Sequence, residues 1–563
     1  MNSNTSTAST NNILLSTSIL RFCFFPIVGA MLIIAPSLFA ATGVNGNLVS
    51  VEWLQKNLGK PDVLVLDASP MPMHKAKHIA GAVPVDFFAY GAPNTPLAGM
   101  EQHFQSWGIS PGKKIVIYDQ GGTWYATRLF FSLVYHHFPD ASLYVLDGGL
   151  SKWEAQGFPV TKEATPSPAK GTFKVSKTNE ALRVRLPEFL TASGDVANNV
   201  LLVTLGADWH FGEVLSFDRA GHIPRAIMMP SDDFFNPDKT FKSVGDIQRQ
   251  LRYLGIRGDQ TIHNHCGGGG AASVSFFALK YMLNHSKATL YVESQMGWLS
   301  DPRDLPYWTY DAPYLMRNAD WLKSWGGRTL RMIGMAQLSV VDVRSADEFN
   351  SGHIPFALNI PAEVFKGNLA DLNKLAKTLG PAGVNATHEA VIVSGGGLTR
   401  ESALAFVMLE KLGQKKISVL MEAADKWVQL GFVVTAEKTL VGTGKSPMDM
   451  AIPPSIYPEN FRQDIIIANP GSSKGLFPKV FIASGKSVPA KAPDGKIVHV
   501  PYTALLNADG TPKAAKDIWN ILAKAGVPRY AELISFAEDP GEAAINYFIL
   551  KLMGYPDIKM LAI

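Results

Sequence analysis

The sequence predicts an α/β protein built from tandem units, each a parallel five-stranded sheet with helices on both faces. Three observations lead to this fold class. Short and almost continuous apolar runs alternate with longer apolar stretches of helical composition, which is typical of parallel strands that are buried on both faces. Gly-rich turns separate these runs. The same order of elements then returns along the chain at intervals of about 120 to 135 residues, the size of an ordinary domain.

The first expected strand of each unit leads to a turn around a histidine. These strand and turn pairs are Val63–Asp67 with His78–Ala82, Val200–Val203 with Gly221–Ala226, and Ser339–Arg344 with Gly352–Ala357.

A second strand, a Gly-rich turn and an apolar helix follow in each unit, and then a third strand and a tryptophan. The second strands are Ile115–Tyr118, Thr261–Cys266 and Ala390–Val393; the third strands with their tryptophans are Ser142–Leu146 with Trp153, Thr289–Val292 with Trp298, and Ile417–Met421 with Trp427. After Cys266 the helix is expected over Ser273–Leu283.

A fourth unit is a poorer copy. Asp464–Ala468 is expected to be its first strand, Lys496–Pro501 stands at the histidine turn, and Ala531–Phe536 is the strand before the loop. The expected division of the chain is a leader at 1–41 and units at 46–163, 178–312, 318–438 and 455–563.

Composition narrows the class of protein and its location. The chain is 47% hydrophobic and 18% charged, which fits a globular protein with large cores, and a net charge of +4 over 563 residues gives no reason to expect a nucleic-acid partner. A polar start and Arg21 precede the apolar run Phe22–Ala40, the layout of a secretory signal peptide. We therefore expect export to the periplasm with cleavage near Ala40 or Ala41. An uncleaved leader would be the protein's one membrane contact.

Cysteine usage directs attention to one residue. The chain has two cysteines, Cys23 in the leader and Cys266, so the mature protein can form no intramolecular disulfide. Cys266 ends an expected strand and begins a loop of four glycines, whose backbone N–H groups can turn inward and favour an anion or a thiolate. The alternative is a buried, inert cysteine before a flexible loop. A lone thiol in an oxidising compartment favours the chemical role.

Together these motifs resemble the rhodanese (thiosulfate sulfurtransferase) superfamily, from about residue 48 onward. The matching motifs are Asp-Val-Arg at Asp342–Arg344, Gly-His-Ile-Pro at 221–224 and 352–355, Tyr-Asp-x-Gly-Gly at Tyr118–Gly122, Leu-Asp-Gly-Gly-Leu-x-x-Trp at Leu146–Trp153, and the loop Cys266–Ala271.

The resemblance implies sulfur transfer through a cysteine persulfide, without a cofactor. Cys266 would be the nucleophile, and the loop amides that hold the bound sulfur would come from Gly267, Gly268, Gly269, Gly270 and Ala271. The donor would be thiosulfate, or another persulfide or polysulfide, and the acceptor would be cyanide or a thiol, possibly one on a protein.

The other units lack this nucleophile. Asp119 or Gln120 stands at the equivalent position in unit one, Ser394 in unit three, and Ala537 or Glu538 in unit four. A serine is a much poorer nucleophile toward sulfur without a base to activate it. We therefore expect units one, three and four to be non-catalytic.

Positive charge is missing where many active members of the family have it. The loop contains no Arg or Lys, and 204–206 replaces the Asp-x-Arg pattern at the end of the first strand of unit two. Candidates for the missing charge are His265, His222 and Arg219. The alternatives are hydrogen-bonded histidines of the core and a solvated surface arginine. His263 and His265 alternate on one face of their strand while Cys266 faces the other, so no metal site is expected.

Unit three retains two arginines where an anion site would need them. We expect Arg344 to form a structural ion pair with Asp347 or Glu348; the alternative for Arg344 and Arg400 is a vestigial anion pocket.

Two function classes remain open. One is an exported sulfurtransferase that uses Cys266; the other is a non-catalytic scaffold or binding protein of the cell envelope. A phosphatase-like use of the loop is disfavoured because Ala271 or Ala272, not an arginine, closes it.

Overall fold

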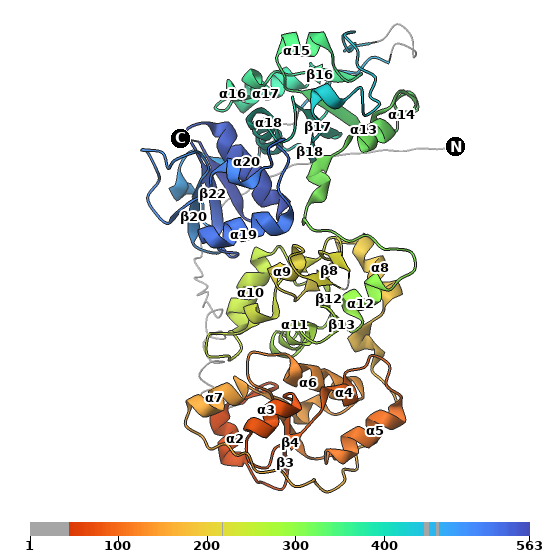
Figure 1. The fold of residues 1–563 in the computed structure, drawn as a ribbon, viewed down its shortest axis with the longest axis vertical. Coiled ribbons are helices and arrows are strands. Elements are labelled where there is room, and N and C mark those ends of the chain that lie inside the picture. Colours follow the sequence, from red (N-terminus) through yellow and green to blue (C-terminus); the bar gives the residue numbers. More distant parts are fainter. Residues whose placement is uncertain (1–43, 217, 444–449, 458–460, 563) are drawn as a thin grey trace, which may run out of the picture.

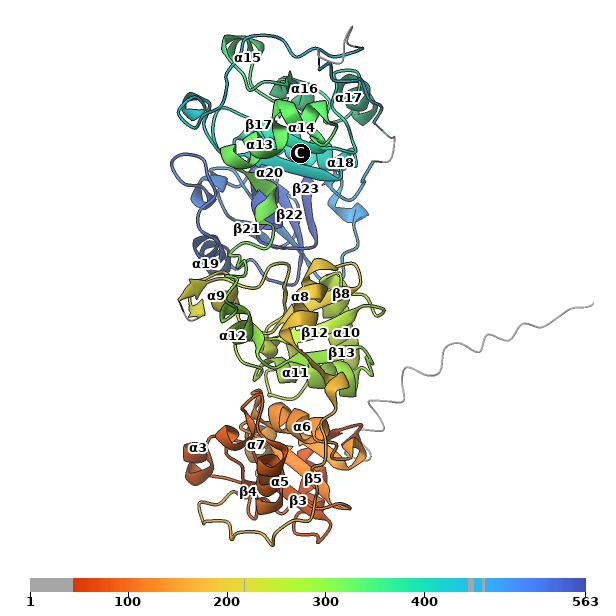
Figure 2. The same cartoon turned by 90° about the vertical axis from the view of Figure 1, so that its right-hand side faces the viewer.

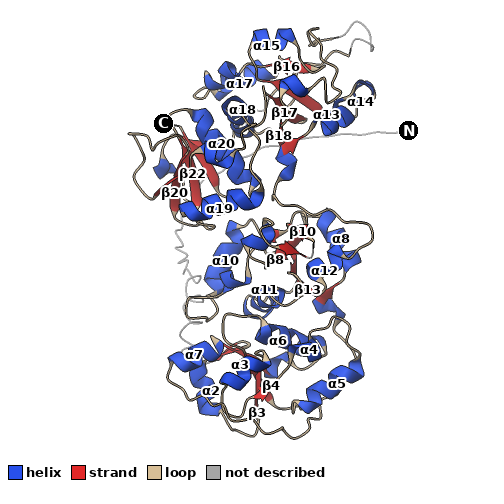
Figure 3. Ribbon diagram, viewed as in Figure 1, coloured by secondary structure: helices blue, strands red, loops and turns tan. Residues whose placement is uncertain are grey.

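The computed structural model describes residues 44–216, 218–443, 450–457 and 461–562, and the expected leader lies outside these residues. This part of the chain contains four large sheets, each flanked by helices (Figures 1 and 3), and confirms the predicted α/β class and tandem arrangement. We number the units one to four by their sheets. Within the described ranges, no helix combines the length and apolar character needed to cross a membrane.

Unit one has one strand more than predicted. Its sheet order is β1-β2-β6-β5-β3-β4, and β1 pairs with β2 in antiparallel fashion, whereas the other neighbours are parallel. The strands are β1 (Val44–Asn45), β2 (Leu48–Val49), β3 (Val63–Asp67), β4 (Val83–Pro84), β5 (Lys114–Tyr118) and β6 (Leu143–Leu146). The helices are α2 (Val51–Asn57), α3 (Met71–Ala76), α4 (Phe87–Tyr90), α5 (Leu97–Ser106), α6 (Tyr125–Tyr135) and α7 (Gly149–Ala155).

Unit two has the sheet order β11-β8-β12-β13-β7 and a separate hairpin, β9–β10. The strands are β7 (Arg183–Val184), β8 (Asn199–Val203), β9 (Leu215–Ser216), β10 (Arg219–Ala220), β11 (Ile227–Met228), β12 (Thr261–His265) and β13 (Ala288–Tyr291). The helices are α8 (Leu186–Gly194), α9 (Ala207–His210), α10 (Val244–Tyr253), α11 (Ala272–Phe277) and α12 (Ser294–Leu299). The helix expected after Cys266 is α11, which continues as a π-helical turn at Ala278–Met282.

Unit three has the sheet order β14-β18-β17-β15-β16. The strands are β14 (Met316–Arg317), β15 (Leu338–Asp342), β16 (Ala357–Asn359), β17 (Glu389–Val393) and β18 (Lys416–Leu420). The helices are α13 (Ala319–Gly326), α14 (Arg328–Met332), α15 (Ala346–Ser351), α16 (Ala362–Lys366), α17 (Leu372–Leu379) and α18 (Arg400–Lys411).

Unit four corrects one strand prediction. Its sheet order is β19-β23-β22-β20-β21, with β19 (Ile466–Ile467), β20 (Lys479–Ala483), β21 (Ile497–His499), β22 (Glu532–Phe536) and β23 (Ile558–Leu561), and helices α19 (Ala515–Ala525) and α20 (Pro540–Leu552). The run at 464–468 forms the edge strand β19, which matches β2, β7 and β14. The counterpart of β3 is β20, which the sequence did not reveal because no Gly-His-Ile-Pro turn follows it.

The units associate in pairs. Helix α6 of unit one packs on α11 of unit two, and α18 of unit three packs on α20 of unit four. Residues 126–135 of α6 are all buried, because this helix lies between two units and has no solvent face. One apolar cluster joins units one and two, and another joins units three and four. Each pair therefore shares a continuous core.

The two pairs stack end to end in an order that differs from the sequence. Figure 2 shows unit four between unit two and unit three. Tyr253 of unit two donates hydrogen bonds to the carbonyls of Arg529 and Ala531, and Arg529 forms an ion pair with Asp233. Unit four thus connects the first pair to unit three.

Candidate active site at Cys266

Cys266 lies at the carboxyl edge of the sheet in unit two. It follows β12 directly, β12 is the middle strand of the sheet, and the thiol-bearing residue is only 3% exposed. In parallel α/β sheets, sites form at this edge. Within the described ranges Cys266 is the free cysteine.

The loop after Cys266 presents backbone donors. The N–H of Gly269 donates a hydrogen bond to the Cys266 Sγ over 3.1 Å. Gly269 adopts φ +79°, and a Cβ there would lie 2.6 Å from the Val292 carbonyl oxygen, so this position requires glycine. Among the described residues, no hydrogen-bond partner is found for the amides of Gly267, Gly268, Gly270 and Ala271. The loop can therefore offer several N–H groups to an anion.

Ser294, which the sequence analysis missed, fixes this loop. Its hydroxyl accepts hydrogen bonds from the N–H of Cys266 at 3.0 Å and of Gly269 at 3.1 Å, and donates to the Tyr291 carbonyl at 2.7 Å. Ser294 is fully buried with φ +52°, a conformation that costs free energy in a residue with a side chain. Gly149 stands at the same distance before the tryptophan of unit one with φ +55°. The sequence signal that could have identified Ser294 is a serine at a position where unit one has a glycine.

Unit one forms one wall of the site. A Cβ on Gly270 would lie 2.9 Å from the Trp124 ring, so the loop touches unit one directly. Thr127 Oγ1 and Ser273 Oγ are hydrogen-bonded across the interface at 2.8 Å. A Cβ on Gly267, in contrast, would meet no atom within 4 Å, so the loop is open at this residue.

Comparison with known proteins identifies the family. A model described as "Rhodanese-like domain" matches residues 50–156 and 327–430. The chain is 30% identical over 267 residues to the sulfur carrier protein TtuD of Thermus thermophilus, an alignment that covers 45% of this chain and 93% of that protein. The chain belongs to the rhodanese family. It is also 25% identical over 307 residues to thiosulfate/3-mercaptopyruvate sulfurtransferase 2 of Arabidopsis thaliana, with 47% and 87% covered.

Among solved structures, the rhodanese chain is similar to SseA from Escherichia coli, described with the 3-mercaptopyruvate sulfotransferases. The TM-score is 0.40 at 22% identity, and the match covers 44% of this chain and 99% of SseA. Several of the family's relatives are named sulfurtransferases, so rhodanese-type sulfur transfer is the activity of this family.

In rhodanese unit one, an aspartate occupies the place of the cysteine. Asp119 follows β5 as Cys266 follows β12, so Asp119 and not Gln120 is the equivalent residue. Its carboxylate accepts hydrogen bonds from the N–H groups of Gly121 at 2.8 Å and Ala126 at 3.0 Å. Burial raises the pKa of this carboxyl above its ordinary value, although the two amides act in the opposite direction.

In rhodanese unit three, a backbone carbonyl of the loop and not an N–H group faces the residue at the cysteine position. Ser394 follows β17, and its hydroxyl donates to the carbonyl of Gly397 over 3.1 Å. The N–H of Gly397 points away and donates to the Met421 carbonyl at 3.0 Å. A carbonyl oxygen therefore faces the residue at the cysteine position. In unit four the equivalent residue is Ala537, directly after β22.

Burial argues against a positive charge on two of the predicted side chains, His265 and His222. His265 is fully buried beside Phe189, 5.2 Å between ring centroids, and burial lowers the pKa of His265 to about 3. His222 stacks on His210, its Nδ1 is 2.7 Å from the His210 carbonyl oxygen, and burial lowers its pKa to about 3 as well. Both imidazoles are therefore neutral near pH 7.

Arg219 was the third candidate, and its charge is used elsewhere. Its guanidinium forms an ion pair with Asp304 at 2.8 Å, donates to the Leu305 carbonyl and lies over the ring of Tyr307. The structure thus brings the glycine loop to Cys266 and leaves these three side chains out of the site.

The described residues contain one cluster of potential metal ligands, and it is not at Cys266. It comprises His210, His222 and Asp311, with His210 Nε2 2.7 Å from the Asp311 carboxylate. The two imidazole rings are stacked 3.6 Å apart with an angle of 3° between their planes. Nitrogen lone pairs lie in the ring plane, so two parallel rings do not direct them at a common ion. The geometry fits a buried hydrogen-bonded pair better than a metal site.

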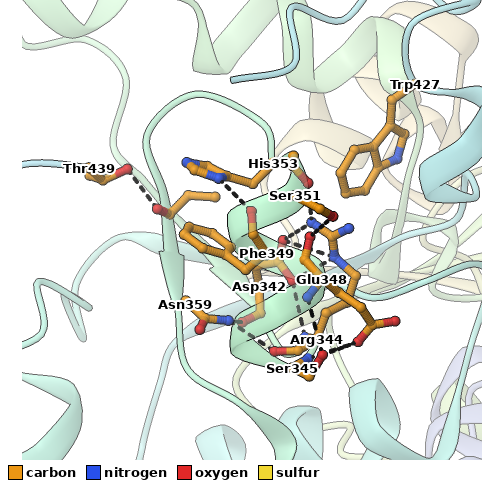
Figure 4. A network of polar contacts seen from close by, with 12 residues as sticks. Asp342, Arg344, Ser345, Glu348, Phe349, Ser351, His353, Asn359, Trp427 and Thr439 are labelled. Atoms are coloured by element: carbon orange, nitrogen blue, oxygen red, sulfur yellow. Dashed lines mark hydrogen bonds and ion pairs between the residues drawn. The ribbon is translucent and has the colours of Figure 1, made fainter. Parts of the chain in front are cut away.

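Arg344 is structural, but with a different partner from the one predicted. It forms an ion pair with Asp342, donates to the Gly352 carbonyl at 3.0 Å and lies over the ring of Trp427 at 4.7 Å (Figure 4). Glu348 instead forms a capping box with Ser345 at the start of α15. The aspartate and the arginine of the Asp-Val-Arg motif therefore pair with each other and stabilise the segment that follows β15. Arg400 pairs with Asp539 of unit four.

Proposed function

We propose that this protein is an exported sulfurtransferase that carries sulfane sulfur as a persulfide on Cys266. The donor is thiosulfate or another persulfide or polysulfide, and the acceptor is a thiol or cyanide. The observation that carries the proposal is the Gly269 N–H directed at the Cys266 Sγ in a loop whose other amides have no partner among the described residues. The family's sulfurtransferases support it.

The chemistry follows from these groups. The Cys266 thiolate attacks the outer sulfur of thiosulfate, the sulfur–sulfur bond of the donor breaks, and its electron pair leaves on sulfite. The terminal sulfur of the new persulfide carries the negative charge, which the loop amides can stabilise. In the second step an acceptor thiolate attacks that terminal sulfur, and the electron pair of the bond returns to Cys266.

Intact-mass spectrometry tests this proposal. The purified protein is measured before and after incubation with thiosulfate, polysulfide and glutathione persulfide, beside the Cys266→Ser variant. A gain of one sulfur atom that dithiothreitol removes and the variant lacks is the expected result, and it also identifies the donor. If no donor loads Cys266, the sulfurtransferase assignment fails.

The second candidate is a scaffold or binding protein. Half of the exposed large apolar side chains of the described residues lie in unit three and the segment after it: Trp325, Met332, Ile333, Met335, Val428, Leu430, Val433, Val434, Leu440 and Ile456. Such side chains favour contact with another protein. Absence of persulfide loading, together with a stable complex isolated through this unit, would favour this function.

Export to the periplasm is part of the proposal and rests on the leader, residues 1–41. Determining the N-terminus of protein from the periplasmic fraction tests it. A mature chain that begins after Ala40 or Ala41 is expected; an intact leader in the membrane fraction would show that the leader is an anchor instead.

A further inference from the structure

A cavity between units one and two lies next to the Cys266 loop. Its volume is about 270 Å³, and it is lined from both units. Val292, which contributes to its wall, follows β13, the strand adjacent to β12, and its carbonyl approaches Gly269. The cavity is therefore connected to the Cys266 loop through Val292, while Cys266 and residues 267–271 do not line it themselves.

Three arginines line this cavity: Arg128, Arg183 and Arg185. Glu180 is the one carboxylate among the residues that line it, and it pairs with Arg185 at 3.0 Å. Arg183 also has a carboxylate partner, Glu293. The excess positive charge of the cavity therefore comes from Arg128.

Arg128 is buried without a counter-ion. It is 3% exposed and forms no ion pair with any carboxylate of the described chain. One NH group donates to the Gly91 carbonyl at 3.1 Å, and Nε has no hydrogen-bond partner. A buried, unpaired guanidinium is unfavourable unless an anion compensates it. Burial lowers the pKa of Arg128 to about 10, while the negatively charged forms of Tyr90 and Cys266 favour its charged state.

Arg183 adds a second donor and a direct connection to the loop. Its side chain is 2% exposed, and its Nε also lacks a hydrogen-bond partner. It donates to the Pro93 carbonyl at 2.7 Å and to Asn94 Oδ1 at 3.2 Å, so it ties unit two to the loop after α4. Its ion-pair partner Glu293 precedes Ser294, the residue that holds the Cys266 loop. An anion at Arg183 would therefore be linked to the Cys266 loop through Glu293 and its neighbour Ser294.

We propose that Arg128 and Arg183 form the site that binds the anionic head group of the sulfur donor, at the interface of units one and two. The inference rests on the proposed sulfurtransferase function and deepens it, because it assigns donor recognition to an arginine from a unit without a nucleophile. The ligand is a small anion that carries an oxyanion or a carboxylate. Unit one thus supplies the charge that the glycine loop lacks.

Alkylation of Cys266 by an anionic reagent and by a neutral reagent tests the anion site without requiring sulfur transfer. Iodoacetate is an anion and iodoacetamide is neutral, yet both react with the same thiolate. The full chain carrying Cys23→Ser is compared with the same chain that also carries Arg128→Gln, Arg128→Lys or Arg183→Gln. Arg257→Gln is the matched control, because Arg257 pairs with Asp259 before β12, at the opposite edge of the sheet.

The expected result is a change in the ratio of the two rates. Arg128→Gln lowers the iodoacetate to iodoacetamide ratio at least five-fold, Arg183→Gln lowers it less, and Arg128→Lys and Arg257→Gln keep it within two-fold. An unchanged ratio in Arg128→Gln overturns the proposal. Equal loss of both rates in Arg128→Gln also overturns it, since that result means a general distortion of the interface.

Competition distinguishes the class of head group. Sulfate stands for the oxyanion of thiosulfate, and acetate stands for an organic carboxylate. Slower iodoacetate labelling with sulfate assigns an inorganic donor, and slower labelling with acetate assigns a carboxylate donor, provided that Arg128→Gln abolishes the effect. If neither anion slows labelling, the site is refuted. If the site is present but no donor loads Cys266, the proposed function fails while the anion site stands.

Discussion

Units two and three have the same sheet order, yet their loops present opposite polarity to the residue that follows the middle strand. In unit two the N–H of Gly269 points at the Cys266 sulfur. In unit three the carbonyl of Gly397 accepts a hydrogen bond from Ser394, and the N–H points outward. Both glycines have positive φ, +79° and +64°. Unit three therefore differs from unit two in the backbone of this loop as well as in the residue at the cysteine position.

Unit one shows a third outcome of the same loop. Its amides point inward, as in unit two, but the carboxylate of Asp119 occupies them. The side chain at the cysteine position thus takes the hydrogen bonds that a bound anion would otherwise accept. The comparison teaches that inward amides can be retained without a nucleophile.

The largest expected effect comes from Gly269→Ala. The new Cβ would lie 2.6 Å from the Val292 carbonyl at φ +79°, so the loop must shift and its N–H must leave Cys266. We expect persulfide loading to fall about 100-fold, the typical loss of one oriented backbone-type donor, and stability to fall by about 1 to 2 kcal/mol. Loading followed by intact mass and a thermal melt measure these effects.

Gly258→Ala is the matched control for this substitution. A Cβ there meets no atom within 4 Å and φ is not positive, so both rate and melting temperature should stay unchanged. Wild-type loading by Gly269→Ala would show that the inward N–H of Gly269 does not assist persulfide formation.

Ser394→Cys should not create a second active unit. In a Cys266→Ser background, the new thiol faces the Gly397 carbonyl, which disfavours a thiolate. We expect no persulfide, and alkylation by iodoacetamide about ten-fold slower than at Cys266, which corresponds to one lost hydrogen bond to a charged group. Alkylation rates at a fixed pH measure this.

Asp119→Cys in the Cys266→Ser background tests the same relation in unit one, where the loop amides point inward. Its new thiol should react faster than that of Ser394→Cys. Equal reactivity of the two new thiols would show that loop polarity does not control the thiol.

A smaller effect is expected from Gly267→Arg. This position is open, so a side chain fits without displacing the loop. An added positive charge at the mouth should raise loading by thiosulfate several-fold at low salt, and the gain should fade at high ionic strength. Gly267→Gln is the control for size. If Gly267→Gln and Gly267→Arg load at the same rate at low salt, positive charge at residue 267 does not limit the reaction.

A last difference concerns the acid stability of the two pairs. Burial lowers the pKa values of His210, His222 and His265 to about 3 and that of His263 to about 4, and all four lie in unit two. Between pH 6.5 and these values the unfolded unit binds more protons than the folded one. Its free energy of unfolding should therefore decrease as the pH is lowered, by up to about 1.4 kcal/mol per pH unit for each histidine.

Hydrogen exchange, corrected for the intrinsic effect of pH, measures this difference. Protection in β8 and β12 should decrease before protection in β15 and β17 as the pH falls. Asp311 opposes the trend, because burial raises its pKa to about 6 and its protonation stabilises the folded state in acid. Simultaneous loss of protection in both pairs would contradict the prediction.

The sequence predicted the features that local patterns encode. Apolar runs located β3, β8 and β15 within a residue or two, and the Gly-rich turn located the loop of Cys266. It missed β20, which no recognisable turn follows, and it could not reveal the pairing of the units. That pairing depends on contacts such as Phe130 on Phe277, between residues far apart in the chain.

The charge state of the candidate side chains depends on features that the sequence also does not contain. His265 is adjacent to Cys266 in sequence, yet burial leaves it neutral. Arg128 is distant in sequence, yet it lies at the interface next to the loop. Charge state depends on desolvation and on neighbours from other units, and a linear pattern contains neither.

The position of unit four between units two and three has a consequence for biosynthesis. Chains generally fold from the N-terminus as they leave the ribosome, so the pair of units one and two can be complete while unit three still lacks its neighbour. Helix α18, buried along residues 402–411 in the finished protein, must wait for α20 before its apolar surface is covered. Nascent chains paused between these helices should therefore recruit chaperones at unit three, and not at the unit that carries Cys266.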